Sequence, residues 1–435
     1  MIHTLRFKGG EVKYANKWIE TERYKIERNL KRDVFLNVGE LFGIVGILKL
    51  LTTVPLRQKL TAVDRLNSGQ ANTAVNFIND RAFANHEGSL PFEIYFNDDG
   101  TFESVGFQNF DDVLNYPFTA HPKVVKNKLH FIGYDGQPDT AHMKYGSYNL
   151  DTNTISPYFD VPIDVTPFVH DFGATENTAV LIENSILFGV DGIIEGVFFR
   201  LKNDHNLRFG LVPSGNASAA AIQWYSFGTS YATMHTLNTW EDGDSVYHAS
   251  GVADRFEGDL QRQDESTQFR MAVFEINKST GMVNLLEMDQ QVLAEFPRVH
   301  PAFTGVFAQY GYAVIQTKIP GTFIGIAKYD LGSRTVVNKI YFEERMIAGE
   351  VIPIPKTGDN GVPSDGVWLG TFIQNFATNQ SEWHLYDGTT MSPVPVARLL
   401  IDGRRVPFGF HCEWISEEKL QRHIAMHTHQ KNRKI

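Results

Sequence analysis

The sequence predicts an all-β protein of the propeller or barrel class, and three observations lead to that prediction. Short runs of apolar and β-branched residues recur about every ten residues, as in proteins built from many short strands. Gly, Asn, Asp and Pro, which turns favour, separate the runs. No long amphipathic helix interrupts residues 71–414. The strand pattern recurs without any repeat of the amino-acid sequence itself, so it does not fix a number of blades.

The first forty residues alternate apolar and polar side chains around a turn at Gly9-Gly10, which predicts short strands. Residues 39–56 differ, because apolar side chains occupy nearly every face of this stretch. Such a stretch is either a helix buried in the core or a helix that lies in a bilayer interface, and both interpretations stay open.

Residues 71–414 contain the repeated strand pattern. Representative runs are residues 92–95 before a turn at 97–100, residues 129–134 before 135–136, and residues 271–276 before 277–281. From Ser416 the sequence becomes helical and then basic, and we expect a frayed, solvated terminus there. Residues 1–420 therefore read as one domain with an apolar helical insertion near 39–56, followed by a basic tail at 421–435.

Composition narrows the classes of partner and compartment. The chain has 435 residues, 42% of them hydrophobic and 12% aromatic, enough for a packed core. Its formal charge of −10 argues against nucleic acid, which needs a basic surface. The single cysteine, Cys412, excludes an internal disulfide and suits a reducing compartment, where it reads as a small buried hydrophobe. No apolar run reaches the roughly 20 residues that span a bilayer, and no signal peptide follows Met1.

Four histidines share one setting, an apolar segment bounded by a turn: His121, His170, His235 and His411. Neutral imidazole is the commonest metal ligand and suits iron, zinc and copper. The four rings can converge on one ion if the fold brings strand ends to an axis. Taken singly, a histidine in such a place is more often a satisfied core residue. We keep that interpretation for six other histidines, which are His86, His130, His142, His248, His300 and His384.

At these segments the chain resembles the carotenoid cleavage oxygenase family, most closely the members that cut at the 9,10 and 9′,10′ double bonds. The resemblance runs from Met1 to about residue 420. Each supporting segment is short, but their order is specific. The segments are Met1-Ile2-His3-Thr4-Leu5-Arg6, Ala71-Asn72-Thr73-Ala74, His170-Asp171-Phe172-Gly173-Ala174-Thr175-Glu176-Asn177, Trp240-Glu241-Asp242-Gly243-Asp244, Glu295-Phe296-Pro297-Arg298-Val299 and Arg405-Val406-Pro407-Phe408-Gly409-Phe410-His411.

The resemblance implies a seven-bladed β-propeller with short helices capping the face over an axial Fe(II) ion. The four histidines above would be its ligands. Family members orient the ligand rings with three glutamates, and Glu87 and Glu295 match the first two. Where the family shows Glu-Asp-Asp-Gly, this chain has Pro363-Ser364-Asp365-Gly366. We therefore expect one ligand to lack its carboxylate, with water, a carbonyl group or Asp365 as substitutes.

In the family, a further segment with an Arg-Asn-Gly-Pro-Asn-Pro motif precedes the residues that match Met1-Ile2-His3. We therefore expect the propeller to be incomplete at its N-terminus, which also makes any targeting sequence unreadable. The resemblance implies a cytoplasmic or plastid enzyme at the periphery of membranes, because carotenoids partition into bilayers. Residues 39–56 are the expected membrane contact.

The implied function is a non-haem Fe(II) dioxygenase that uses O₂ to cleave a C=C double bond of a carotenoid or apocarotenoid into two carbonyl products. Phe168, Met234 and Phe410 lie near ligands in the sequence and are either substrate-tunnel or core residues. Two alternatives stay open. One is cleavage of stilbenes, although His86 stands where stilbene-cleaving members place a lysine. The other is a catalytically impaired propeller that serves as a binding module.

Overall fold

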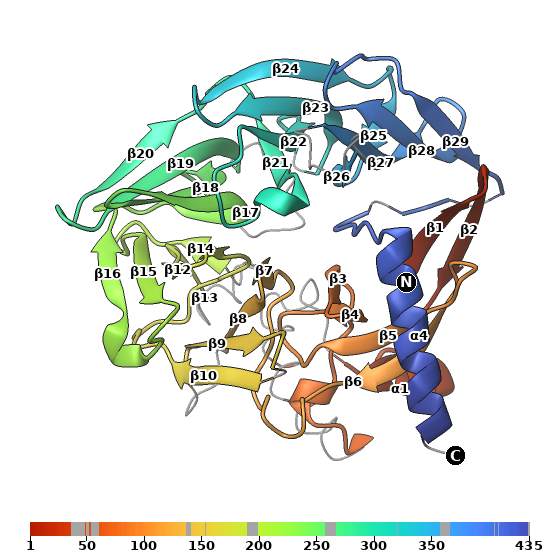
Figure 1. Ribbon diagram of the computed structural model, residues 1–435, viewed down its shortest axis with the longest axis horizontal. Coiled ribbons are helices and arrows are strands. Elements are labelled where there is room, and N and C mark those ends of the chain that lie inside the picture. Colours follow the sequence, from red (N-terminus) through yellow and green to blue (C-terminus); the bar gives the residue numbers. More distant parts are fainter. Residues whose placement is uncertain are drawn as a thin grey trace.

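A computed structural model describes residues 1–35, 48, 52–53, 61–135, 141–152, 154–188, 199–256, 267–319, 321–356, 366–403, 405–407 and 409–433. Antiparallel sheets surround a central axis in these residues, and helices are few (Figure 1). The prediction of an all-β propeller-type fold is confirmed.

The first four sheets around the axis each have four strands, and chain order runs along each sheet. The first holds β3 (Ala74–Ile78), β4 (Arg81–Asn85), β5 (Phe92–Phe96) and β6 (Phe102–Phe107). The second holds β7 (Lys123–Val125), β8 (Lys128–Tyr134), β9 (Met143–Asn149) and β10 (Thr154–Asp160). The third holds β11 (Gly173–Ala174), β12 (Thr178–Glu183), β15 (Arg208–Pro213) and β16 (Gln223–Ser226). The fourth holds β17 (Ala232–Asp242), β18 (Ser245–Ala253), β19 (Arg270–Asn277) and β20 (Val283–Glu287).

The next two arrays are joined into one nine-stranded sheet. One array holds β21 (Ala294–Val299), β22 (Tyr310–Gln316), β23 (Phe323–Asp330) and β24 (Thr335–Tyr341). The other holds β26 (Ile352–Pro355), β27 (Val367–Asn375), β28 (Gln380–Asp387) and β29 (Ala397–Ile401). Strand β25 (Met346–Ala348) pairs with both β23 and β27 and so links the arrays. A hairpin of β13 (Ile186–Phe188) and β14 (Phe199–Leu201) is separate.

A second hairpin, β1 (Ile2–Lys8) with β2 (Glu11–Lys17), stands between the last array and the first (Figure 1). The Thr4 hydroxyl donates to the Gly100 carbonyl at 2.7 Å, after β5. On the other side, the Phe7 ring lies 5.1 Å from the Trp383 ring on β28. The hairpin therefore bridges the two ends of the ring, so the described residues place six four-stranded arrays and one two-stranded hairpin around the axis.

The hydrophobic core lies between neighbouring sheets rather than in one central mass. One cluster joins Leu237 on β17 and Val273 on β19 to Ala313 on β22 and Ala327 on β23. Because both faces of such a sheet are covered, its strands are apolar on both sides, and every residue of β12 is buried. Burial of this apolar surface stabilises the ring and leaves the axis for polar groups.

Helix α4 (Glu417–Arg433) lies across the ring beside β5 (Figure 1). Its His423 is buried, accepts a hydrogen bond from the Phe96 amide at 3.0 Å and contacts the Asp80 carbonyl at 2.7 Å. The helix that the sequence predicts from Ser416 is therefore present, and residue 420, given above as the end of the domain, lies inside it. The other helical elements are α1 (Glu22–Leu30), η2 (Arg65–Asn67), η3 (Ala219–Ala221) and η4 (Pro301–Phe303).

The expected apolar insertion at 39–56 lies outside the described residues, apart from Leu48 and Thr52–Thr53. Within the described part of the chain, no helix has the length and hydropathy that crossing a bilayer requires.

Candidate metal centre

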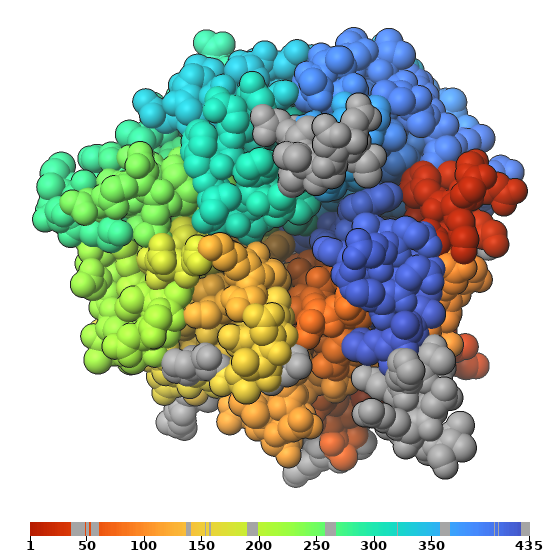
Figure 2. Space-filling model, in the orientation of Figure 1, coloured from red at the N-terminus to blue at the C-terminus, as the bar shows by residue number. Residues whose placement is uncertain are grey.

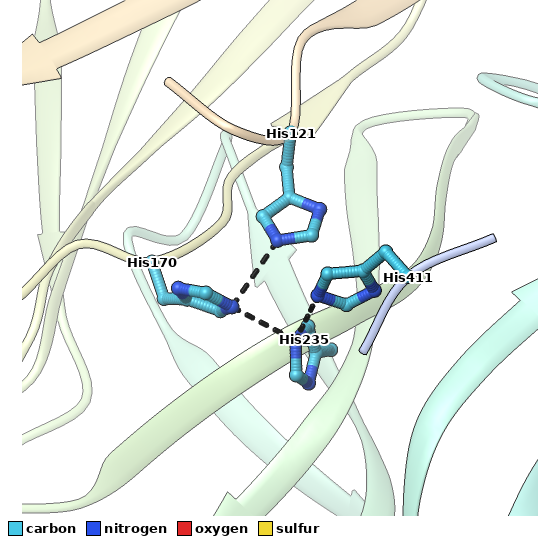
Figure 3. Close-up of side chains that lie close together, drawn as sticks. All are labelled: His121, His170, His235 and His411. Atoms are coloured by element: carbon cyan, nitrogen blue, oxygen red, sulfur yellow. Dashed lines mark hydrogen bonds between the residues drawn. The ribbon is translucent and has the colours of Figure 1, made fainter. Parts of the chain in front are cut away.

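Four histidines from distant parts of the chain meet near the ring axis (Figure 3). His121 precedes β7, His170 precedes β11, His235 lies in β17, and His411 follows β29. One ring nitrogen from each falls within 4.8 Å of the other three. The Nε2 atoms of His121 and His170 are 3.1 Å apart, those of His170 and His235 2.8 Å, and those of His235 and His411 3.2 Å. The structure thus brings together all four residues that the sequence singled out.

Three of the rings are held from behind by carboxylates. Glu87 Oε1 lies 2.5 Å from Nδ1 of His170, and Glu295 contacts Nδ1 of His235. Tyr134 donates its hydroxyl to the other Glu87 oxygen at 3.2 Å. A carboxylate that accepts from Nδ1 fixes both the tautomer and the orientation of the ring. Glu87 and Glu295 therefore occupy the places that the sequence predicted for them.

The expectation of a missing third carboxylate is wrong, because Glu350 supplies it. Its Oε1 lies 3.1 Å from Nδ1 of His411, and Oε2 accepts from the Cys412 amide at 2.6 Å. The expected substitute, Asp365, lies outside the described residues. A signal for Glu350 was present in the sequence, since it is one carboxylate inside the otherwise apolar run from Met346 to Pro355.

Glu350 also neutralises a cation near the axis. Arg298 donates to its two oxygens at 2.8 and 3.1 Å and to the Cys412 carbonyl at 3.3 Å. Burial opposes ionisation of Glu350, but Arg298 and His411 outweigh that cost and hold its pKa at about 2. Glu350 is therefore a carboxylate at neutral pH, and it links the His411 segment to β21.

A second buried carboxylate joins the segments of the other three histidines. Asp171 lies 2.5 Å from the Lys123 ammonium and accepts from the Thr236 amide at 2.9 Å. These residues are neighbours of His170, His121 and His235 respectively. Burial alone would raise the pKa of Asp171, but Lys123 lowers it below its usual value. One charged side chain thus fixes the spacing of three rings.

Strand β21 reaches the site through a bulge after Glu295, where its register with β22 shifts. The next residue, Phe296, has a φ of 50°, which a bulky residue rarely adopts. Its ring centre lies 4.8 Å from that of His235 and 5.2 Å from that of His411. The bulge therefore turns Glu295 toward one histidine and places an aromatic wall against two. Sequence reasoning used this segment for its glutamate and missed Phe296.

The arrangement fits a cation. When Nδ1 donates its proton to a carboxylate, the Nε2 atom carries a lone pair, and three such lone pairs point to one place. Lone pairs facing one another without a positive charge between them are unfavourable. Burial and the neighbouring rings hold the pKa of His121 well below its usual value, which leaves that imidazole neutral and free to bind a metal. Four imidazoles suit iron, as well as zinc and copper.

The three expected tunnel residues lie in two different places. Phe168 and Met234 pack into an apolar cluster with Phe199, and the Phe168 ring stacks on His170 at 5.8 Å. Phe410 lies apart from this cluster, is 56% exposed, and lines a cavity beside His411. The six histidines assigned to the core all lie outside the group of four. His130, for example, contacts the Tyr145 hydroxyl at 2.7 Å.

Comparison with known proteins gives one consistent result. Residues 1–416 match the family model described as RPE65, retinal pigment epithelial membrane protein. The chain is 28% identical to carotenoid 9,10(9′,10′)-cleavage dioxygenase 1 of Phaseolus vulgaris, over 97% of this chain and 80% of the relative. It is 26% identical to the carotenoid 9,10(9′,10′)-cleavage dioxygenase of Crocus sativus, with the same coverage.

Two solved structures share the fold. The lignostilbene dioxygenase of Pseudomonas brassicacearum superposes with a TM-score of 0.75 at 21% identity, covering 94% of this chain and 85% of that one. Cobalt-substituted ACO, the apocarotenoid oxygenase of Synechocystis, superposes with a TM-score of 0.77 at 19% identity, covering 95% and 86%. With the family model matched over nearly the whole chain, this protein belongs to the RPE65 and carotenoid cleavage oxygenase family and is an oxygenase.

Proposed function

We propose that this protein is an Fe(II)-dependent dioxygenase that cleaves a C=C double bond of a carotenoid or apocarotenoid into two carbonyl products. One observation carries the proposal: four imidazoles converge, three of them held by Glu87, Glu295 and Glu350. His121, His170, His235 and His411 would hold the iron, which when bound supplies the one-electron and O₂ chemistry.

The chain's own part in this reaction is to position the polyene and exclude water. Both oxygen atoms of O₂ leave in the two carbonyl groups, so no protein acid or base is needed to balance the reaction. The described surroundings suit that task, since Phe168 and Phe296 lie against ligand rings and offer apolar walls. The names of the plant relatives, which are carotenoid dioxygenases, support a carotenoid substrate.

Incubation of the iron-loaded protein with β-carotene, lycopene, a C27 apocarotenoid and resveratrol, with products identified by mass, tests the substrate class. We expect carbonyl fragments from at least one polyene and none from resveratrol. The His235→Ala variant should lose both iron and product. A folded protein that holds one iron per chain after anaerobic purification yet cleaves no polyene would contradict the proposal.

Stilbene cleavage is the alternative with a named structural relative, the lignostilbene dioxygenase. His86 argues against it, because it stands where stilbene-cleaving members place a lysine for the phenol. Burial lowers the pKa of His86, and its Nδ1 accepts from the Gly88 amide at 3.2 Å. A neutral ring already engaged with the backbone does not replace a cation.

The other alternative is a propeller that binds without catalysis. It rested on two expectations, an incomplete N-terminus and an absent third glutamate, and the second is wrong because Glu350 lies beside His411. Iron content per chain separates the two functions, since a scaffold has no need of the ion.

We also propose that residues 39–56 contact membranes and that the protein works in a plastid or in the cytoplasm. Two plant relatives are named chloroplastic. Replacing Leu50 and Leu51 with Glu should lower vesicle binding and leave iron content unchanged. Unchanged vesicle binding would remove this part of the proposal.

A further inference from the structure

Two cavities adjoin the four histidines, and they differ in chemistry. The first, about 490 Å³, is called the polar channel here, and its lining includes His121, Lys123, Asn238, Arg298, Thr304 and Glu413. The second, about 560 Å³, is called the apolar cavity, and its lining includes Ile2, Phe7, Phe96, Phe372, Phe410 and His411. The centre is therefore reached from one side past charged and amide groups and from another past aromatic rings.

The polar channel follows the axis of the ring. Its walls come from the first strand of each four-stranded array, namely β3, β7, β11, β17, β21 and β26. Residues of η4 and α4 line it as well, so it opens on the face that α4 covers in part. Figure 2 shows that face hollowed near its centre, next to the blue C-terminal segment. The channel therefore connects solvent with His121.

Charge in the polar channel is largely balanced by ion pairs. Lys123 is paired with Asp171, Arg298 with Glu350, and Arg422 with Asp80. The fourth cation of the lining, Lys419, interacts electrostatically with Glu413. The Glu413 carboxyl group, two residues beyond His411, lines both the channel and the apolar cavity. A dication that follows this route therefore passes cations with acidic neighbours, and it meets a carboxyl oxygen of Glu413 beside the ligand rings.

The lining of the apolar cavity also holds His3, Arg6 and Glu417, but a hydrated divalent cation would have to pass its aromatic rings, which offer no oxygen ligands. Transfer of an ion away from water into a site without polar partners is strongly unfavourable. We therefore infer that Fe(II) reaches the four histidines through the polar channel, with Glu413 as a transient oxygen ligand, while the apolar cavity is not used by the ion. This inference rests on the proposed function, because it takes the four histidines to hold Fe(II).

A plug in the channel tests the route. Thr304, at the end of η4, lines the channel and is neither one of the four histidines nor one of their three carboxylates. Thr304→Trp fills part of the channel, and the matched control Thr73→Trp makes the same change in the lining of the apolar cavity. Metal-free protein is mixed with excess Co²⁺ or, without oxygen, Fe²⁺, and uptake is followed over time by absorbance and by metal content per chain.

We expect Thr304→Trp to slow uptake at least tenfold and to reach the same final stoichiometry, while Thr73→Trp takes up metal at the wild-type rate. Glu413→Gln, which keeps the size and replaces one possible oxygen ligand with an amide nitrogen, should slow uptake severalfold. Release of metal to a chelator should slow in parallel for the plugged variant.

Wild-type uptake in Thr304→Trp would overturn the inference, as would slow uptake confined to Thr73→Trp. If the tryptophan variant does not fold, Thr304→Leu, a smaller plug at the same position, carries the test, because Thr304 lines the channel alone whereas Glu413 lines both cavities. Failure of the wild-type protein to bind one metal per chain would instead contradict the proposed function, so the two failures are distinguishable.

Discussion

Replacing Glu350 with Gln separates the two tasks of this carboxylate. Gln keeps the size of the side chain but removes the charge that orients His411 and neutralises Arg298. Loss of such a partner typically weakens metal binding about 10–100-fold, or about 1.4–2.7 kcal/mol. We expect the lower end of that range, because the Glu350–His411 distance of 3.1 Å is the longest of the three carboxylate contacts.

The same substitution should also destabilise the protein. Removal of one partner from a buried ion pair costs about 3–5 kcal/mol, since the remaining charge is left unpaired. The Arg298 side chain is 34% exposed, so water compensates in part, and we expect about 3 kcal/mol or less. Denaturation in urea measures this loss, and a metal titration against a competing chelator measures the affinity.

Glu382→Gln is a matched control for both measurements. Glu382 also holds a histidine, with Oε2 at 2.7 Å from Nε2 of His384, but that histidine is not one of the four at the centre. The control should change stability only. Wild-type metal affinity in a folded Glu350→Gln variant would refute the assignment of Glu350 to the centre.

Three further outcomes are expected. Asp171→Asn should lower both stability in urea and metal affinity, because the Lys123 charge is left unpaired beside His121 and His170. Wild-type values of both would contradict the role of Asp171 in fixing the spacing of the rings. Gly251→Ala should lower metal content, since a Cβ there would lie 2.5 Å from Glu295 Oε1, and full metal content would show that the carboxylate has room to move. Burial lowers the pKa of His130 from 6.5 to about 3, so only the unfolded chain binds the proton between those values and stability falls as pH drops. The free energy of unfolding of the His130→Gln variant, taken relative to that of the wild type, should therefore rise by about 2 kcal/mol as the pH is lowered from 7.5 to 5. Unfolding in urea at the two pH values measures this difference.

Much of the fold followed from local chemistry. The alternation of strand runs with Gly, Asn, Asp and Pro turns predicted the all-β class, because strand and turn preferences act over a few residues. The four histidines were found for the same reason, as each lies in a short apolar segment of recognisable pattern. Glu87 and Glu295 were likewise found from the motifs that contain them.

The contacts that could not be predicted from the sequence are those that form when the ring of sheets closes. Glu350 lies 61 residues from His411, and only the meeting of β25, β26 and the segment after β29 brings them together. Asp171 reads as a neighbour of His170 until the fold places Lys123 and Thr236 around it. The docking of α4 against β5 and the bridging place of the β1–β2 hairpin are likewise set by surfaces distant in the chain. Sequence thus determined which side chains have metal chemistry, whereas the tertiary structure decided which charges hold them, because those contacts form only between residues that folding brings together from distant parts of the chain.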